Sequence, residues 1–223
     1  MLQNSPKYNE IDITSQVKSI QEERLNMASH AFGVILFIIL IPVLLFHAYG
    51  LKNNYYTLGA IVFSISLLMV YISSTFYHHT LDKAKRKKWR TYDHISIYFL
   101  IAGSYTPFLL TYFRDQTGLI VLAIIWSIVL IGSLFKWFFT HKFKLLSTLA
   151  YLAMGWMALF LIEPILLKLP YVALIWLVIG GLSYSIGVVF FLWEKLFQNH
   201  FIWHMFVLGG SFSHYMAVYY CID

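Results

Sequence analysis

The chain has 223 residues, of which 60% are hydrophobic and 12% are charged, and its mean hydropathy is +0.70. Soluble domains carry about 25% charged residues, so this composition excludes an ordinary soluble protein and indicates an integral membrane protein. The single cysteine, Cys221, excludes an intrachain disulfide and a cysteine-based metal site.

A polar segment, residues 1–26, comes first and lacks the pattern of a cleaved signal peptide. Its stretch 13–26 is compatible with a short helix on the membrane surface. Seven apolar runs follow, each near the roughly 20 residues that cross a hydrocarbon core of about 30 Å. They cover residues 27–49, 56–79, 94–113, 118–139, 145–163, 171–193 and 201–220. Because the loops are short, we predict an all-α membrane protein with one seven-helix transmembrane domain, residues 27–220.

Basic residues divide unevenly between the predicted loops. With a cytoplasmic N-terminus, 13 of the 16 Lys and Arg residues lie inside, and only Lys52, Arg114 and Lys168 lie outside. Cytoplasmic loops carry an excess of Lys and Arg, so the sequence predicts an inner N-terminus and an outer C-terminus. The net charge of +6 is thereby explained without a nucleic-acid partner. We expect Lys83–Arg90 to attract anionic lipid headgroups and Lys136 to extend to the inner interface.

Polar side chains gather at the predicted cytoplasmic ends of three spans. They are Ser74, His78 and His79 at the end of the second span, Asp93 and His94 at the start of the third, and His200 and His204 at the start of the seventh. Ionisable residues inside a membrane are costly, and they are usually functional or satisfied by a neighbour. The sequence therefore predicts a functional site in the inner leaflet.

The spacing of these residues suggests a metal. His200 and His204 lie one helical turn apart on one face and can bind one ion together. A third imidazole from the second span completes a set of three, which together with a water is the pattern of a catalytic zinc site. We favour His78 over its neighbour, because Ser74 lies one turn away on the same face and can hold its ring. Asp93 is expected to deprotonate the metal-bound water or to orient a ligand.

Plainer interpretations apply to several of these residues. A lone His-x-x-x-His pair is more often interfacial than metal-binding, and Ser74 alone is more often bonded to its own helix. His94 is equally compatible with a structural hydrogen bond. His214 lies about 15 Å deeper than His204 and is expected to be a satisfied interior histidine. His47 and His141 are expected to be interfacial.

Five stretches together carry a likeness to a known family. They are EERLNMASHAFG (22–33), SSTFYHH (73–79), YDHISIYFLIAGSYTPF (92–108), GWMAL (155–159) and HFIWHMFVLGGSFSH (200–214). In this order they resemble the bacterial hemolysin III branch of the progestin and adipoQ receptor family. The resemblance implies a seven-helix protein of the bacterial plasma membrane with a cytoplasmic N-terminus, in agreement with the charge count.

The resemblance also assigns roles to individual residues. It implies that His78, His200 and His204 hold a zinc ion, that Ser74 belongs to the motif of the first ligand, and that Asp93 contacts the zinc-bound water. Asn26 and His30 match a bacterial signature of the family and are expected to support the site from the same leaflet. His79 and His94 are further candidates for positions around the metal.

The family resemblance leaves three functions to weigh. One is a zinc hydrolase acting on a membrane lipid amide or ester, since receptors of this family resemble intramembrane ceramidases in their metal site. Another is a regulator or sensor of membrane composition and energetics with structural zinc. A pore-forming cytolysin is the weakest, because a channel needs polar stripes and these spans lack Asp and Glu in their middles. A retinal protein is excluded, because the seventh span has no lysine. We favour the lipid hydrolase.

Overall fold

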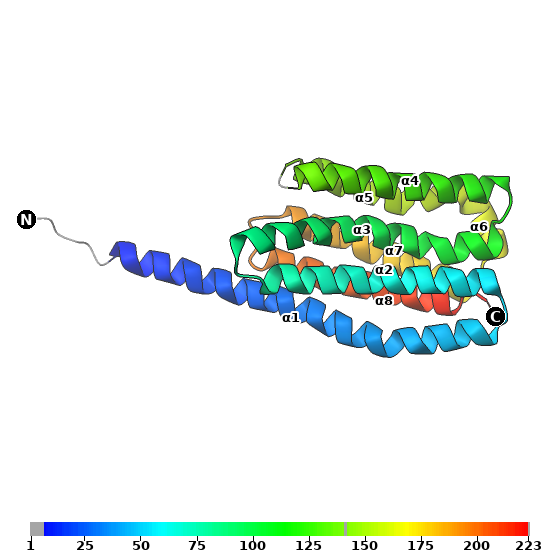
Figure 1. The fold of residues 1–223 in the computed structure, drawn as a ribbon, viewed down its shortest axis with the longest axis horizontal. Coiled ribbons are helices and arrows are strands. Elements are labelled where there is room, and N and C mark those ends of the chain that lie inside the picture. The colour runs from blue at the N-terminus through cyan, green and yellow to red at the C-terminus, as the bar shows by residue number, and fades with distance from the viewer. Residues whose placement is uncertain (1–6, 141, 223) are drawn as a thin grey trace, which may run out of the picture.

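The computed structural model describes residues 7–140 and 142–222, with side chains from residue 20 onward. Within those residues every regular element is a helix, which confirms the all-α prediction. The elements are α1 (Lys7–Gly50), α2 (Asn54–His79), α3 (Lys83–Tyr112), α4 (Gln116–Phe139), α5 (Lys144–Gly155), the 3₁₀ helix η1 (Trp156–Leu161), α6 (Ile162–Lys168), α7 (Tyr171–Leu192) and α8 (Asn199–Tyr219). They lie roughly parallel in one elongated bundle (Figure 1).

Six segments of the described chain are long and apolar enough to cross a membrane. They are Ile20–Gly50, Asn54–His79, Lys83–Tyr112, Gln116–Phe139, Lys144–Lys168 and Tyr171–Leu192. They correspond to the first six predicted spans, and α5, η1 and α6 together form the fifth. α8 is not among them, because three histidines, two glycines and two serines lower its hydropathy. A seventh span therefore stays a prediction.

The first helix differs from the expectation of a separate surface helix at 13–26. The structure has one continuous α1, whose first turns extend beyond the rest of the bundle (Figure 1). Nothing interrupts it, since no proline or glycine occurs between residue 7 and Gly33. Pro42 lies inside α1, and the helix changes direction toward its C-terminal end. Proline removes a helix hydrogen bond and commonly causes such a bend.

The interior is formed mainly where α2 packs against α1 and α3, and where α8 packs against α7 and α1. Its largest fully buried side chains include Tyr56, Tyr71 and Phe37. α1 comes very close to α2 at Gly33, where an added Cβ would lie 2.2 Å from the ring of Tyr71. Small residues permit this kind of close helix approach in membranes. The glycine therefore lets α1 pack directly against α2 at Tyr71.

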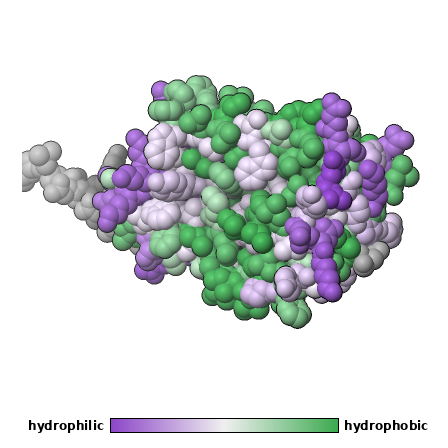
Figure 2. Space-filling view, turned by 45° about the vertical axis from the view of Figure 1, so that its right-hand side comes forward, coloured by the Kyte–Doolittle hydropathy of each residue, from purple (hydrophilic) through white to green (hydrophobic). Residues whose placement is uncertain are grey.

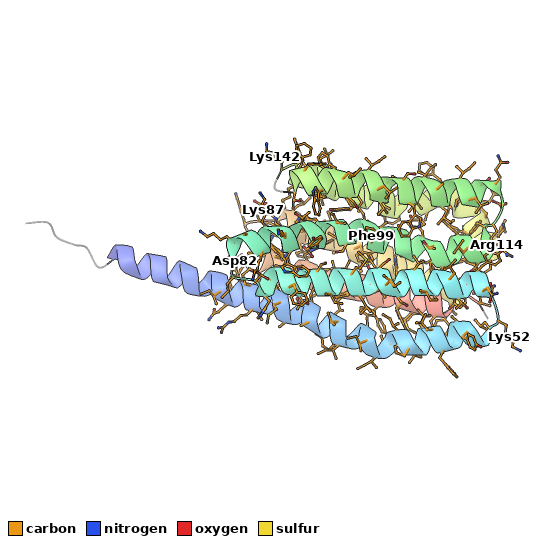
Figure 3. All side chains as sticks on the ribbon, viewed as in Figure 1. Lys52, Asp82, Lys87, Phe99, Arg114 and Lys142 are labelled. Carbon is orange, nitrogen blue, oxygen red and sulfur yellow. The ribbon has the colours of Figure 1, made fainter. Side chains whose placement is uncertain are left out.

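The surface has the pattern expected of a protein in a bilayer. Figure 2 shows hydrophobic residues over the middle of the molecule and hydrophilic residues toward its two ends. Outward-facing side chains such as Phe46 and Phe160 are 82% and 84% exposed, which suits contact with lipid. Lys87 and Lys142 lie at one end of the bundle, and Lys52 and Arg114 lie at the other (Figure 3).

Lys136 does not extend to the inner interface as expected. Its side chain is only 1% exposed, and its Nζ lies 6.0 Å from the centre of the Tyr151 ring. The aromatic face gives the ammonium group a favourable contact inside the bundle. Neighbouring helices, rather than the headgroup region, therefore surround this lysine.

Candidate metal centre

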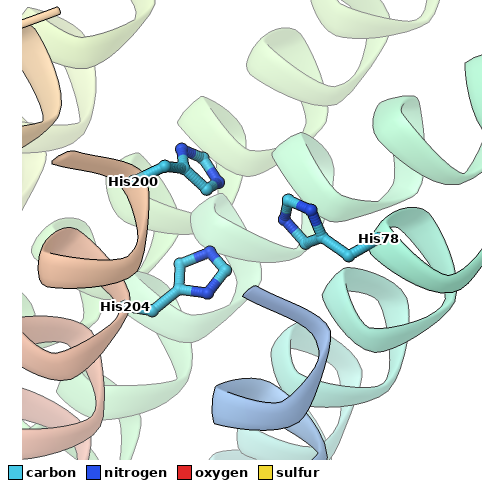
Figure 4. A group of neighbouring side chains, drawn as sticks. All are labelled: His78, His200 and His204. Carbon is cyan, nitrogen blue, oxygen red and sulfur yellow. The ribbon is translucent and has the colours of Figure 1, made fainter. Parts of the chain in front are cut away.

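Three histidines from two helices meet at one end of the bundle. His78 lies in the last turn of α2, and His200 and His204 lie in the first two turns of α8. One ring nitrogen of each histidine lies within 4.8 Å of a ring nitrogen of the other two. Figure 4 shows the three rings converging on a common point. The structure thus brings together the three residues that the sequence analysis proposed as metal ligands.

Short connections place these histidines beside the start of α3. α2 ends at His79, and Asp82 caps α3 by accepting a hydrogen bond from the backbone N–H of Lys85 at 2.8 Å. α8 begins after Gln198, whose φ of 55° is a left-handed conformation that ends the preceding loop. The helix that follows carries both of its histidines on one face, because they are four residues apart.

The hydrogen bonds of two histidines fix which ring nitrogen remains for a metal. Nδ1 of His78 lies 2.7 Å from Oε2 of Glu23. Nδ1 of His204 lies 3.2 Å from the backbone carbonyl oxygen of Asn26 and 2.9 Å from Oγ of Ser29. A carboxylate and a carbonyl only accept hydrogen bonds, so both Nδ1 atoms carry the proton. The lone pair of each ring then resides on Nε2, the usual arrangement for a metal-bound histidine with an outer partner.

The donor set fits a divalent metal such as zinc. Nε2 of His78 is buried and has no hydrogen-bond partner among the described residues. His78 and His204 are 6% and 2% exposed, so their nitrogens are largely shielded from bulk water. Three imidazoles are an established zinc ligand set that leaves a fourth coordination position open. No ligating cysteine is needed.

Glu23 is a site residue that the sequence analysis did not identify. Its second carboxylate oxygen lies 2.5 Å from Nη2 of Arg86 in α3, so this one side chain links α1, α2 and α3. The signal in the sequence was its spacing: Glu23, Asn26 and His30 are three and seven residues apart and share one helix face. Polar residues that share one face at the start of a long apolar helix indicate an inward-facing cluster.

Asp93 and Ser74 lie beside the histidines. The carboxylate of Asp93 accepts a hydrogen bond from Ser74, and it lies within electrostatic range of His78 and Arg90. The sequence analysis expected Ser74 to hold the ring of His78. In the structure Glu23 takes that position, and Ser74 is bonded to Asp93 instead. The result is a half-buried carboxylate beside the ligand cluster.

The structure separates the remaining candidates near the site. His30 is 4% exposed, and its ring centre lies 3.7 Å from that of His204. Asn26 contributes the backbone contact to His204 described above and is 5% exposed. His79 is exposed and is not part of the cluster. Nδ1 of His94 lies 2.6 Å from the carbonyl oxygen of Arg90, a bond within its own helix.

Two of the histidines that were expected to lie elsewhere, His214 and His47, are not part of the cluster. His214 has a hydrogen bond with the backbone of Leu177, in accordance with a satisfied interior histidine. His47 stacks on Tyr219 with ring centres 4.3 Å apart. His141 lies outside the described residues.

An ion pair lies near the outer edge of the cluster. Nζ of Lys144 is 2.6 Å from Oε1 of Glu194 in the loop before α8. The Lys144 ammonium group lowers the pKa of the Glu194 carboxyl by a hydrogen bond and by its charge. The same ammonium group lies 4.4 Å from the ring centre of Phe191, which in turn lies 5.9 Å from the ring of His200.

Comparison with known proteins shows which family the chain belongs to. Residues 18–215 match a family model described as "Haemolysin-III related". The chain is 38% identical over 205 residues to "Hemolysin-3 homolog" of Bacillus subtilis (strain 168), covering 92% of this chain and 96% of that protein. It is 39% identical over 210 residues to "Hemolysin-3" of Bacillus cereus, covering 94% and 96% respectively.

A more distant similarity reaches mammals. The chain is 29% identical over 169 residues to human "Monocyte to macrophage differentiation factor", covering 71% of this chain and 68% of that protein. This similarity fits the wider superfamily named in the sequence analysis. No solved structure matches the chain. Together with the apolar helices, the bacterial relatives identify a multi-pass protein of the bacterial plasma membrane. The chain belongs to the haemolysin-III related family.

Proposed function

We propose that the protein is a zinc-dependent hydrolase that acts on an amide or ester of a membrane lipid, with His78, His200 and His204 as the zinc ligands. The main support is the hydrogen bonding of the ligand rings. Glu23 and the backbone carbonyl of Asn26 accept hydrogen bonds from Nδ1 of His78 and of His204. Nε2 of His78 has no hydrogen-bond partner among the described residues. Three protein ligands with one open position are typical of catalytic rather than structural zinc.

The neighbouring residues have complementary roles in this proposal. Zinc, when bound, supplies a Lewis acid that polarises a carbonyl and activates water. Asp93 takes the proton from the attacking water, and the hydrogen bond from Ser74 keeps its carboxylate in place. Glu23 holds the ring of His78 in the orientation that a metal requires. The site lies at one end of apolar helices, where a lipid headgroup would be within reach.

The proposal includes seven spans, with the N-terminus in the cytoplasm. α8 has 21 residues, about 31 Å at 1.5 Å per residue, which is enough to cross the hydrocarbon core. The start of α1 and the end of α8 lie at opposite ends of the bundle (Figure 1), as an odd number of crossings requires. Lys87 and Lys142 lie at the end where α1 begins (Figure 3), which favours the cytoplasm for that end.

A regulator with structural zinc is the second candidate. Its support is that the cluster joins α2 and α8, while Glu23 and Arg86 add α1 and α3. A metal at such a junction can control helix packing without turnover. A pore is not favoured, although two relatives carry the name Hemolysin-3, because large side chains such as Tyr56 and Tyr71 fill the interior.

Substitution of Asp93 separates hydrolase from regulator. Asn has nearly the same shape and still forms hydrogen bonds, but it cannot act as a base. We expect Asp93→Asn to retain zinc and fold while lipid turnover falls by about 10²–10⁴. Lipidomics of membranes from a deletion strain carrying the wild type or this variant measures the effect. If the zinc-loaded variant restores the lipid profile fully, the regulator is correct and the hydrolase is wrong.

A further inference from the structure

Two side chains of α1 place unpartnered polar atoms beside the histidine cluster. Oδ1 of Asn26 and both ring nitrogens of His30 are buried and have no hydrogen-bond partner among the described residues. The two residues are 5% and 4% exposed, so both side chains point into the bundle. They lie four residues apart on one face of α1.

These atoms are costly where they lie, and the metal does not account for them. A buried polar group without a partner loses its hydration and gains nothing in return, so folded proteins rarely contain several together. The candidate ligand group consists of His78, His200 and His204 and includes neither residue, and Asn26 contacts His204 through its backbone carbonyl rather than its side chain. Packing alone would be served as well by apolar side chains of similar size.

Their position points toward a ligand. The ring of His30 lies 3.7 Å from that of His204 and 5.0 Å from that of Tyr71, measured between ring centres. The unpartnered nitrogens of His30 therefore lie directly beside one of the three clustered histidines. A ligand bound at the cluster would therefore lie beside the ring of His30.

We propose that Asn26 and His30 form a subsite that binds a polar group of the ligand adjacent to the metal; this rests on the proposed zinc site. A neutral histidine has one N–H donor and one acceptor nitrogen in either tautomer, and Oδ1 of Asn26 only accepts. The matching group carries both a donor and an acceptor on neighbouring atoms, as an N–H next to a carbonyl does. The ligand class is therefore a membrane-soluble molecule with such a paired group.

Two probes that differ in one hydrogen-bond donor test this subsite. Dodecanohydroxamic acid binds zinc through its two oxygen atoms and keeps an N–H. Its N-methyl derivative binds zinc in the same way but has no N–H. The zinc-loaded full chain in lipid nanodiscs is titrated with each probe. We expect the wild type to bind the N–H probe roughly tenfold more tightly, the value of one good hydrogen bond.

Conservative variants assign this preference to the two residues. Asn26→Leu keeps the backbone carbonyl that contacts His204, and we expect it to abolish the preference between the probes. His30→Phe keeps an aromatic ring beside His204. We expect it to lower the affinity for both probes roughly tenfold, because one hydrogen bond is lost. His79→Phe, at an exposed position outside the cluster, is the matched control and should change neither affinity.

Zinc content and thermal stability are measured on the same samples. Both test variants should keep one zinc per chain and an unfolding temperature equal to or above that of the wild type, because they remove unpartnered polar groups. An unchanged preference in Asn26→Leu, or unchanged affinity in His30→Phe, overturns the subsite while leaving the zinc site intact. Zinc loss or a lowered unfolding temperature in either variant also overturns it. A wild type without zinc overturns the proposed function itself, and the subsite with it.

Discussion

The carboxylate of Glu23 and the imidazole of His78 form a hydrogen bond of 2.7 Å between residues 55 positions apart in the chain. Glu23 also pairs with Arg86, so its carboxylate is held from two sides. A carboxylate bonded to Nδ1 fixes the tautomer and orientation of a ligating histidine and makes Nε2 a stronger donor. The hydrogen bond therefore connects α1 to a proposed zinc ligand in α2.

Removal of this carboxylate should weaken metal binding without removing a ligand. We expect Glu23→Ala to lower zinc affinity by about 10–100-fold, the usual effect of losing an outer-shell partner. A competition titration with a zinc chelator of known affinity measures the change. Glu22→Ala, one residue away and outside the cluster, is the matched control and should bind zinc like the wild type. Equal affinities of the two variants would show that Glu23 does not orient His78.

Ser29 should have a smaller effect on the same measurement. Its Oγ lies 2.9 Å from Nδ1 of His204, but the carbonyl oxygen of Asn26 contacts the same nitrogen at 3.2 Å. Because one acceptor remains, we expect Ser29→Ala to lower zinc affinity less than tenfold. If Ser29→Ala lowered zinc affinity as much as His204→Ala does, the carbonyl oxygen of Asn26 would not be sufficient to hold the His204 ring.

The fold and the ligand cluster were largely predictable because their signals are local. The pair His200 and His204 shares one helix, and long apolar runs identify the first six spans, although the first and third begin at Ile20 and Lys83, 7 and 11 residues before their predicted starts. Glu23 and Ser29 were missed because their partners lie 55 and 175 residues away. The charged run around Glu23 resembles a solvated membrane-surface segment until the tertiary contact with Arg86 is known. The prediction that Lys136 extends to the inner interface was wrong for the same reason, since its aromatic neighbour Tyr151 comes from another helix.

The seven-span topology predicts opposite locations for the two ends of the chain. A tag before residue 1 should be protected from reagents added outside intact cells, and a tag after residue 223 should react. The physical reasons are the length of α8 and the concentration of Lys and Arg at one end of the bundle. Two protected tags, or two accessible ones, would remove one span from the count.

The basic start of α3 should bind anionic lipid. Its side chains Lys83, Lys87 and Lys88 are exposed. Among the described residues they form no salt bridge, whereas Arg86 pairs with Glu23. Each basic residue near an anionic surface contributes about 1 kcal/mol. We expect replacement of these three lysines by Gln to reduce the anionic phospholipid that co-purifies with the protein, measured by mass spectrometry. Lys52→Gln, at the opposite end, should leave it unchanged; equal lipid content in both variants would contradict the assignment.

The zinc content of the purified protein tests the central claim most directly. Elemental analysis should find one zinc per chain in the wild type and in His79→Ala, because His79 is exposed and lies outside the cluster. His78→Ala, His200→Ala and His204→Ala should each lose most of the metal and unfold at a lower temperature, since binding energy of the ion contributes to folding. A wild type without stoichiometric zinc, or a His78→Ala variant that retains it while His79→Ala loses it, would contradict the account.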